Sequence, residues 1–183
     1  FYIVLKIIGK FKLLPLRDLI RIGAVGFLLA VHWVFFYGSI KAANVSVGVV
    51  CFTLTGFFTA IFEPLLLRRK FLPKELLFSF IALMGVLLIF HFDTRYRTGI
   101  ILGIIGAALA ALYTICNKSL NKRYPLSLFF FYQIAGGLVC LSLIMPAYLH
   151  FMNVDVFFPD RRNLLYLCLF AIFCTIFMYM LQI

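Results

Sequence analysis

Two groups of polar and aromatic side chains inside long apolar runs could do chemistry, and a lone amide is a third candidate. The first group is Thr55, Thr59 and Glu63, which recur every four residues and would share one helix face. Polar groups in an apolar span usually face a cavity or a partner helix, so this face is a candidate binding surface. Glu63 could exchange a proton coupled to the movement of a bound solute. Alternatively, it could pair with Arg68, Arg69 or a neighbouring helix near the end of the run.

The second group is His32, Trp33 and Tyr37, which lie in an earlier apolar run. His32 could bind a solute or relay protons, or it could be a neutral ring that hydrogen-bonds to an adjacent helix. Trp33 and Tyr37 are four residues apart and could form an aromatic wall for an organic solute, although lipid contact or core packing would also explain them. The third candidate is Gln133, whose amide must find a partner in a neighbouring helix or in a substrate.

These side chains need elements to hold them, and the composition indicates helices that cross a membrane. Of 183 residues, 65% are apolar and 13% are charged, whereas soluble domains are about half apolar and a quarter charged. About 20 apolar residues span a bilayer as a helix, and these runs are apolar on every side, unlike the strands of a membrane barrel. Six runs come near that length: 22–40, 45–62, 76–92, 99–116, 126–149 and 164–183.

The ends of the sequence suggest a fragment of a longer protein. Residues 1–9 form a seventh apolar run that is too short to span, and it resembles the tail of a severed helix. The chain starts without Met and ends within an apolar run. We therefore expect one partial helix and six complete ones.

Basic residues gather in alternate loops, and this pattern predicts the orientation of the helices. Eleven of them fall on one side: Lys10, Lys12, Arg17, Arg21, Arg68, Arg69, Lys70, Lys74, Lys118, Lys122 and Arg123. Five fall on the other: Lys41, Arg95, Arg97, Arg161 and Arg162. Cytoplasmic loops retain positive charge, so we expect the first side in the cytoplasm. The net charge of +11 is then explained by the loops between membrane-crossing helices. We therefore expect no nucleic-acid partner.

Motifs for catalysis and for metal binding are missing from the sequence. The five cysteines, at positions 51, 116, 140, 168 and 174, all lie in apolar runs and form no CxxC pair. The sequence holds no GxSxG, HExxH or P-loop pattern, and no pair of acidic residues has catalytic spacing within a span. We therefore expect no enzyme, no metal site and no cofactor.

Small residues indicate how the helices pack. The series Gly99, Gly103, Ala107 and Ala111 has a spacing of four, which places small side chains on one helix face and permits close backbone approach. Asn44 precedes another run and is well placed as an N-cap. The connections are short, so successive helices should be antiparallel neighbours in one compact bundle.

Four stretches resemble the EamA-like branch of the drug/metabolite transporter (DMT) superfamily. They are LRDLIRIGAVGFLLAVHWVFFYGSIKAANVSVGVV, EPLLLRRKFLPKELL, ALMGVLLI and GIILGIIGAALAALYTICNK. The resemblance covers nearly the whole chain and implies an all-α, multi-pass transmembrane bundle. The full protein would have ten helices in two inverted five-helix repeats. Here the resemblance places the first repeat at 1–92, an outer linker at 93–98 and a truncated second repeat at 99–183.

The same resemblance implies a function. It is that of an integral membrane secondary transporter, which moves a small organic metabolite or drug-like solute across the cytoplasmic (inner) membrane by alternating access. Its partners would be the solute and the lipid bilayer, with a homodimer left open. The run 45–62 corresponds to the fourth of the family's ten helices. Family members often have a proline within that helix, where this chain has Gly56 and, near the end, Glu63-Pro64. The alternative is a non-transporting membrane scaffold or interaction protein that binds partners through its small-residue faces.

Overall fold

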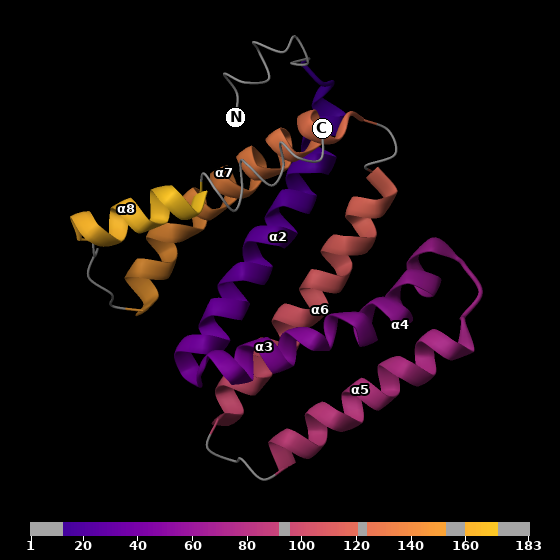
Figure 1. The fold of residues 1–183 in the computed structure, drawn as a ribbon. Coiled ribbons are helices and arrows are strands. Elements are labelled where there is room, and N and C mark those ends of the chain that lie inside the picture. Colours follow the sequence, from indigo (N-terminus) through magenta and orange to yellow (C-terminus); the bar gives the residue numbers. More distant parts are fainter. Residues whose placement is uncertain (1–12, 92–95, 121–123, 153–159, 172–183) are drawn as a thin grey trace. The chain divides into compact units, whose positions relative to one another are not determined.

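The computed structural model describes residues 13–91, 96–120, 124–152 and 160–171, and every regular element in these ranges is helical (Figure 1). This confirms the all-helical class. The helices are α2 (Leu16–Ala42), α3 (Val45–Thr53), α4 (Thr55–Leu67), α5 (Pro73–His91), α6 (Arg97–Leu120), α7 (Leu126–Met152) and α8 (Arg161–Phe170).

Membrane-crossing length is confirmed for four of the predicted runs. In the described part of the chain, the segments long and apolar enough to cross a bilayer are Leu16–Ala42, Val45–Leu67, Arg97–Leu120 and Leu128–Pro146. The predicted runs 76–92 and 164–183 begin within α5 and α8, while residues 1–9 and 172–183 lie outside the described residues. The inverted repeat and its linker stay predictions.

The observed helices extend past the apolar runs that predicted them. α2 begins at Leu16, six residues before the predicted start, because a helix can continue beyond the hydrocarbon layer into polar surroundings. Pro15 immediately precedes it, and the Pro15 carbonyl accepts hydrogen bonds from the backbone N–H groups of Asp18 and Leu19, at 2.9 and 3.0 Å. A proline is well suited to a helix start because its missing N–H would have no partner there.

The chain divides into two compact units, and the first comprises Phe1–Gly26 with Asn121–Ile183. In this unit the start of α2 meets α7 at small residues. A Cβ atom added to Gly136 would lie 2.6 Å from the Cα atom of Gly23, and one added to Gly26 would collide with the carbonyl oxygen of Gln133. Phe129, one helical turn before Gln133 on α7, is fully buried. Glycine is needed here because the two backbones touch.

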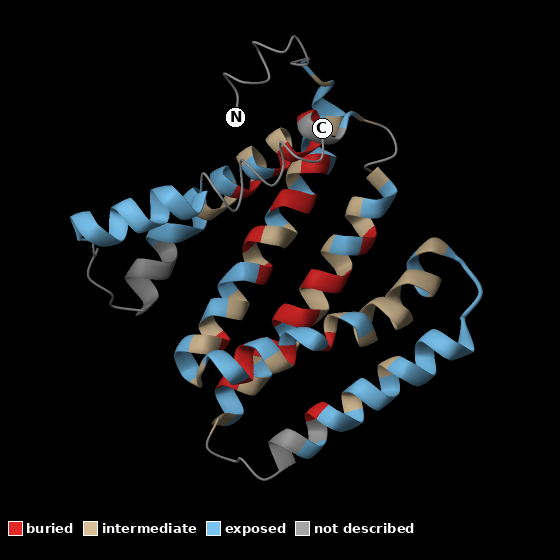
Figure 2. Ribbon diagram, viewed as in Figure 1, coloured by how far each residue is buried: buried red, intermediate tan, exposed pale blue. Residues whose placement is uncertain are grey.

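The second unit, Phe27–Leu120, is organised around α6. The small-residue face of α6 is buried, as the spacing predicted (Figure 2). The buried small residues of this helix are Gly99, Gly103, Gly106, Ala107, Ala110 and Ala111. A Cβ atom on Gly103 would lie 2.6 Å from the Cβ atom of Cys51 in α3. The hydroxyl of Ser39 in α2 donates a hydrogen bond to the Gly99 carbonyl at 2.7 Å. α6 therefore contacts its neighbours almost backbone to backbone.

A joint at Leu54 divides the predicted run 45–62 into α3 and α4. The Leu54 N–H donates to the carbonyl three residues back, at 3.0 Å, so the helix tightens locally. Thr53 and Thr55 flank the joint, and each hydroxyl donates to the carbonyl three residues back, at 2.6 and 2.7 Å. The Leu54 side chain is buried in a core cluster with Val86 of α5 and Ala107 of α6. Asn44 caps α3 as predicted, because its side chain accepts from the Val47 N–H at 2.9 Å.

The outside of this chain is strongly apolar. Leu88, Leu138 and Leu143 expose 69, 65 and 74% of their surfaces, and many other large apolar side chains are also exposed. Soluble monomers rarely expose apolar surface on this scale. Lipid is the environment in which such a surface is stable, in agreement with the four apolar helices.

Candidate functional site

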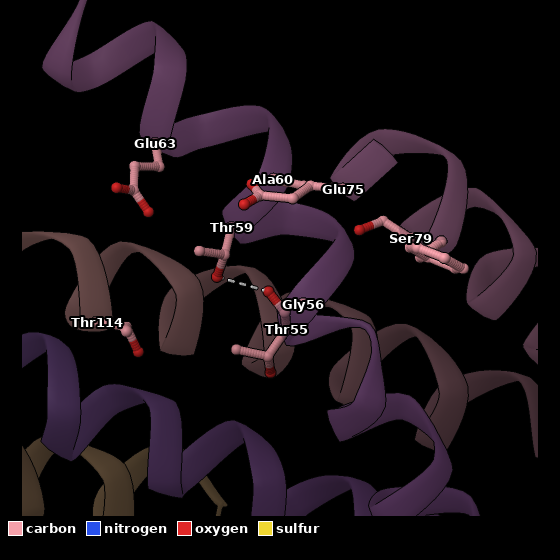
Figure 3. A pocket seen from close by; sticks show the side chains of 9 residues that line it. Thr55, Gly56, Thr59, Ala60, Glu63, Glu75, Ser79 and Thr114 are labelled. Atoms are coloured by element: carbon pink, nitrogen blue, oxygen red, sulfur yellow. Dashed lines mark hydrogen bonds between the residues drawn. The ribbon is translucent and has the colours of Figure 1, made fainter. Parts of the chain in front are cut away.

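The face of α4 that carries Thr55, Thr59 and Glu63 lines a pocket, so the predicted shared face is confirmed. The pocket has a volume of about 430 Å³ and lies among α4, α5 and α6 (Figure 3). The helix α4 that carries this face begins after the joint at Leu54 and ends at Arg68, whose backbone is left-handed with φ of 50°. The lining residues are Thr55, Gly56, Thr59, Ala60 and Glu63 of α4, Glu75, Phe78 and Ser79 of α5, and Thr114 of α6.

The threonine hydroxyls of the pocket donate hydrogen bonds to backbone carbonyls three or four residues back in the chain. Thr55 donates to the Phe52 carbonyl at 2.7 Å, and Thr59 donates to the Thr55 carbonyl at 2.7 Å, the bond dashed in Figure 3. Thr114 on α6 donates in the same way to the carbonyl four residues back, at 2.8 Å. Each hydroxyl oxygen keeps its lone pairs, and so these three residues offer acceptors to a bound molecule.

Glu63 is held by two basic residues. Its Oε1 atom lies 2.7 Å from Nζ of Lys118 on α6 and 3.3 Å from an Nη atom of Arg69, which follows α4. The Lys118 contact joins the ends of α4 and α6, which the basic loops predict to be cytoplasmic. The sequence had left open a pairing role for Glu63 with Arg68, Arg69 or a neighbouring helix, and the structure places it in such a pairing.

Glu75, Ser79 and Thr114 are lining residues that the sequence did not single out as candidates. Glu75 lies in the first turn of α5, where a charge is ordinary, and Ser79 follows it by one helical turn. Figure 3 shows the side chains of Glu75 and Ser79 pointing from α5 toward α4. Their spacing of four residues is the signal that could have found them, because it places both on one face of α5.

The aromatic candidates form a separate cluster in the same unit. His32 is buried, and its Nδ1 atom lies 2.9 Å from the Gly106 carbonyl, so Nδ1 is the protonated donor. The rings of Trp33 and Tyr37 stack at 5.5 Å between centroids, and both are exposed. The helix-bonded alternative for His32 is therefore realised. Neither His32 nor the two exposed rings contribute to the lining of the pocket.

Gln133 belongs to the other compact unit. It lies in α7 and is completely buried, as an amide within a span should be when it has a partner inside the protein. A role for Gln133 in binding a solute stays a prediction, as do the roles of the other six candidates.

Comparison with protein families decides the identity of the chain. Residues 1–91 match the model of the EamA-like transporter family. The chain belongs to this family. No match was found among curated proteins or among solved structures.

Membership of the EamA-like family, taken with the four apolar helices, makes the chain a multi-pass membrane protein of the drug/metabolite transporter kind. The family is one of transporters, whose partners are solutes and lipids, and not one of enzymes. Among the described residues no group of three or more His, Cys, Asp or Glu side chains could hold a metal ion.

Proposed function

We propose that this EamA-like protein is a secondary transporter that carries a small organic solute across the cytoplasmic membrane by alternating access. The pocket among α4, α5 and α6 would form part of the solute path. The observation that supports this proposal is a cavity whose otherwise apolar lining carries several polar side chains, among helices whose exteriors are apolar. Polar side chains are costly in a bilayer and usually mark a pathway or a binding site.

The size of the pocket suits a small organic molecule. Sites for such ligands have volumes of roughly 300–1,000 Å³, and this one has about 430 Å³. Thr55, Thr59 and Glu63 supply polar contacts from one wall, while Phe78 supplies an apolar surface from the other. A few placed polar groups in an otherwise apolar cleft are typical of a site that fixes the orientation of its ligand.

The ion pair between Glu63 and Lys118 suits a contact that forms and breaks during transport. Alternating access requires that one end of the path closes while the other opens. Lys118 exposes half of its side chain and Glu63 a fifth, and exposed pairs contribute only about 0–1 kcal/mol. In our proposal Glu63 also exchanges a proton with the solution when this pair opens, and His32 assists that coupling.

Vesicles containing the full-length protein would test this proposal. They would be loaded with a defined mixture of amines, amino acids, sugars and carboxylates, and efflux would be followed by mass spectrometry with and without a proton gradient. We expect at least one solute class to leave faster than from empty vesicles, and Glu63→Gln and His32→Ala to reduce the effect of the gradient. Asp18→Asn removes an equal charge outside the pocket and is the matched control.

Two outcomes would contradict the proposal. If no solute class moves, the protein is not a carrier, and the scaffold alternative takes its place. If transport and its pH dependence are unchanged in both Glu63→Gln and His32→Ala, the coupling roles are wrong.

A further inference from the structure

We infer that the pocket among α4, α5 and α6 binds an organic cation, a protonated amine, with Glu75 as its counter-ion. This inference rests on the proposed function and names the substrate class of the same site. The lining of this pocket carries mainly hydrogen-bond acceptors.

The lining offers many acceptors and few donors. The hydroxyls of Thr55, Thr59 and Thr114 donate to backbone carbonyls three or four residues back in the chain, so these side chains present lone pairs. Glu63 and Glu75 add carboxylates, which can only accept hydrogen bonds when they are ionised and have no proton to donate. A solute with several N–H donors matches such a surface, whereas a carboxylate or phosphate would find repulsion and almost no donors.

The backbone of α4 adds another acceptor to this wall. Pro64 has no N–H, so the Ala60 carbonyl loses the helical hydrogen bond that a residue four positions later would give it. Ala60 is itself a lining residue. In Figure 3 the Glu75 side chain points from α5 toward α4.

The two carboxylates differ in how they are neutralised. Glu63 is paired with Lys118 and Arg69, at 2.7 and 3.3 Å. Glu75 makes no ion pair with any residue that the structure describes, so its charge is available to a ligand. A charged hydrogen bond from an ammonium group is stronger than a neutral one, which makes Glu75 the natural counter-ion.

The remaining features favour an organic cation over a bare metal ion. A volume of about 430 Å³ is far larger than an inorganic ion needs, and the Phe78 ring lines the pocket on the same helix as Glu75. Aromatic faces attract ammonium groups and also pack against apolar carbon. The pocket therefore fits an amine that carries an apolar or aromatic body.

Tyramine is a suitable ligand for the test, because 4-hydroxyphenylacetate has the same ring with a negative head group. Binding of radiolabelled tyramine to the purified full-length protein would be measured at equilibrium, with 4-hydroxyphenylacetate and sodium ions as separate competitors. We expect saturable binding that Glu75→Gln weakens at least about tenfold, in keeping with the loss of one charged hydrogen bond. Glu75→Asp should retain most of the affinity, and Asp18→Asn should leave it unchanged.

Several results would overturn the inference. One such result is an absence of saturable tyramine binding, and another is an affinity for tyramine in Glu75→Gln equal to that of the unmodified protein. The others are displacement by 4-hydroxyphenylacetate as readily as by unlabelled tyramine, and binding of sodium ions alone at Glu75. Size-exclusion profiles of each variant would show that the protein is still folded. Failure of the proposed function is distinguishable, because a protein that binds tyramine through Glu75 but moves no solute in vesicles retains the site without the transport.

Discussion

Replacement of Gly99 by alanine tests how closely α6 approaches the chain that follows α2. A Cβ atom at Gly99 would lie 2.5 Å from the Cβ atom of Ala43, 3.0 Å from the Ser39 carbonyl oxygen and 3.2 Å from the Ala43 nitrogen. Two of these three atoms belong to the backbone and cannot rotate away. The new methyl group therefore forces α6 and its neighbour apart.

The expected change in the free energy of unfolding is the difference between two effects. Overpacking a well-packed contact destabilises a protein by about 1–3 kcal/mol. Replacing a helical glycine by alanine stabilises the helix itself by up to about 1 kcal/mol. For Gly99→Ala the first effect is larger, so we expect a net loss of about 1–2 kcal/mol. Gly85 has no atom within 4 Å of an added Cβ, so Gly85→Ala should be neutral or stabilising by up to about 1 kcal/mol.

Unfolding of the full-length protein in mixed micelles, titrated with sodium dodecyl sulfate and followed by circular dichroism, would measure both changes. A second variant, Gly99→Ala with Ala43→Gly, removes the nearest atom and should recover about half of the lost stability, because the Ser39 carbonyl still crowds the methyl group. The reasoning is refuted if Gly99→Ala is as stable as the unmodified protein, or if the double variant is no more stable than Gly99→Ala.

Three further substitutions have defined expectations in the same unfolding assay. Lys118→Gln breaks the shorter ion pair to Glu63 and should lower the free energy of unfolding by less than about 1 kcal/mol. In 1 M salt the difference between the variant and the unmodified protein should largely vanish. A larger loss that salt does not change would contradict an exposed pair. His32→Phe keeps an aromatic ring at this position but loses the hydrogen bond to the Gly106 carbonyl. We expect the free energy of unfolding to fall by about 0.5–1.5 kcal/mol, and an unchanged stability would be the contrary result. Asn44→Ala removes the N-cap of α3 and should cost about 1 kcal/mol, whereas Asn44→Asp should keep most of that stability; equal losses would argue against capping.

Most of the helices were predictable because the bilayer imposes a simple rule on the sequence. A span must be apolar over about 20 residues, and the runs that meet this rule are helices wherever the structure describes them. The buried face of α6 was predictable for a similar reason, since the spacing of Gly99, Gly103 and Ala107 matches the helical repeat. Asn44 was readable as a cap from its position alone.

The joint at Leu54 and the far wall of the pocket were not predictable in this way. Leucine is a good helix former, and the tightening at Leu54 depends on packing against α5 and α6, which no local pattern contains. Glu75 lies at a helix start, where acidic residues are common, so its type carries no signal until α5 is placed beside α4. Thr55, Thr59 and Glu63 were found because they interrupt an apolar run.

The joint at Leu54 also bears on how the segment Val45–Leu67 enters the bilayer during synthesis. A segment that meets lipid before its neighbours arrive must satisfy its own backbone polar groups. At the joint, the hydroxyls of Thr53 and Thr55 and the Leu54 N–H all bond to carbonyls only three residues away. These hydrogen bonds at the joint are therefore made within the segment itself, and translocation machinery can treat Val45–Leu67 as a single insertion unit.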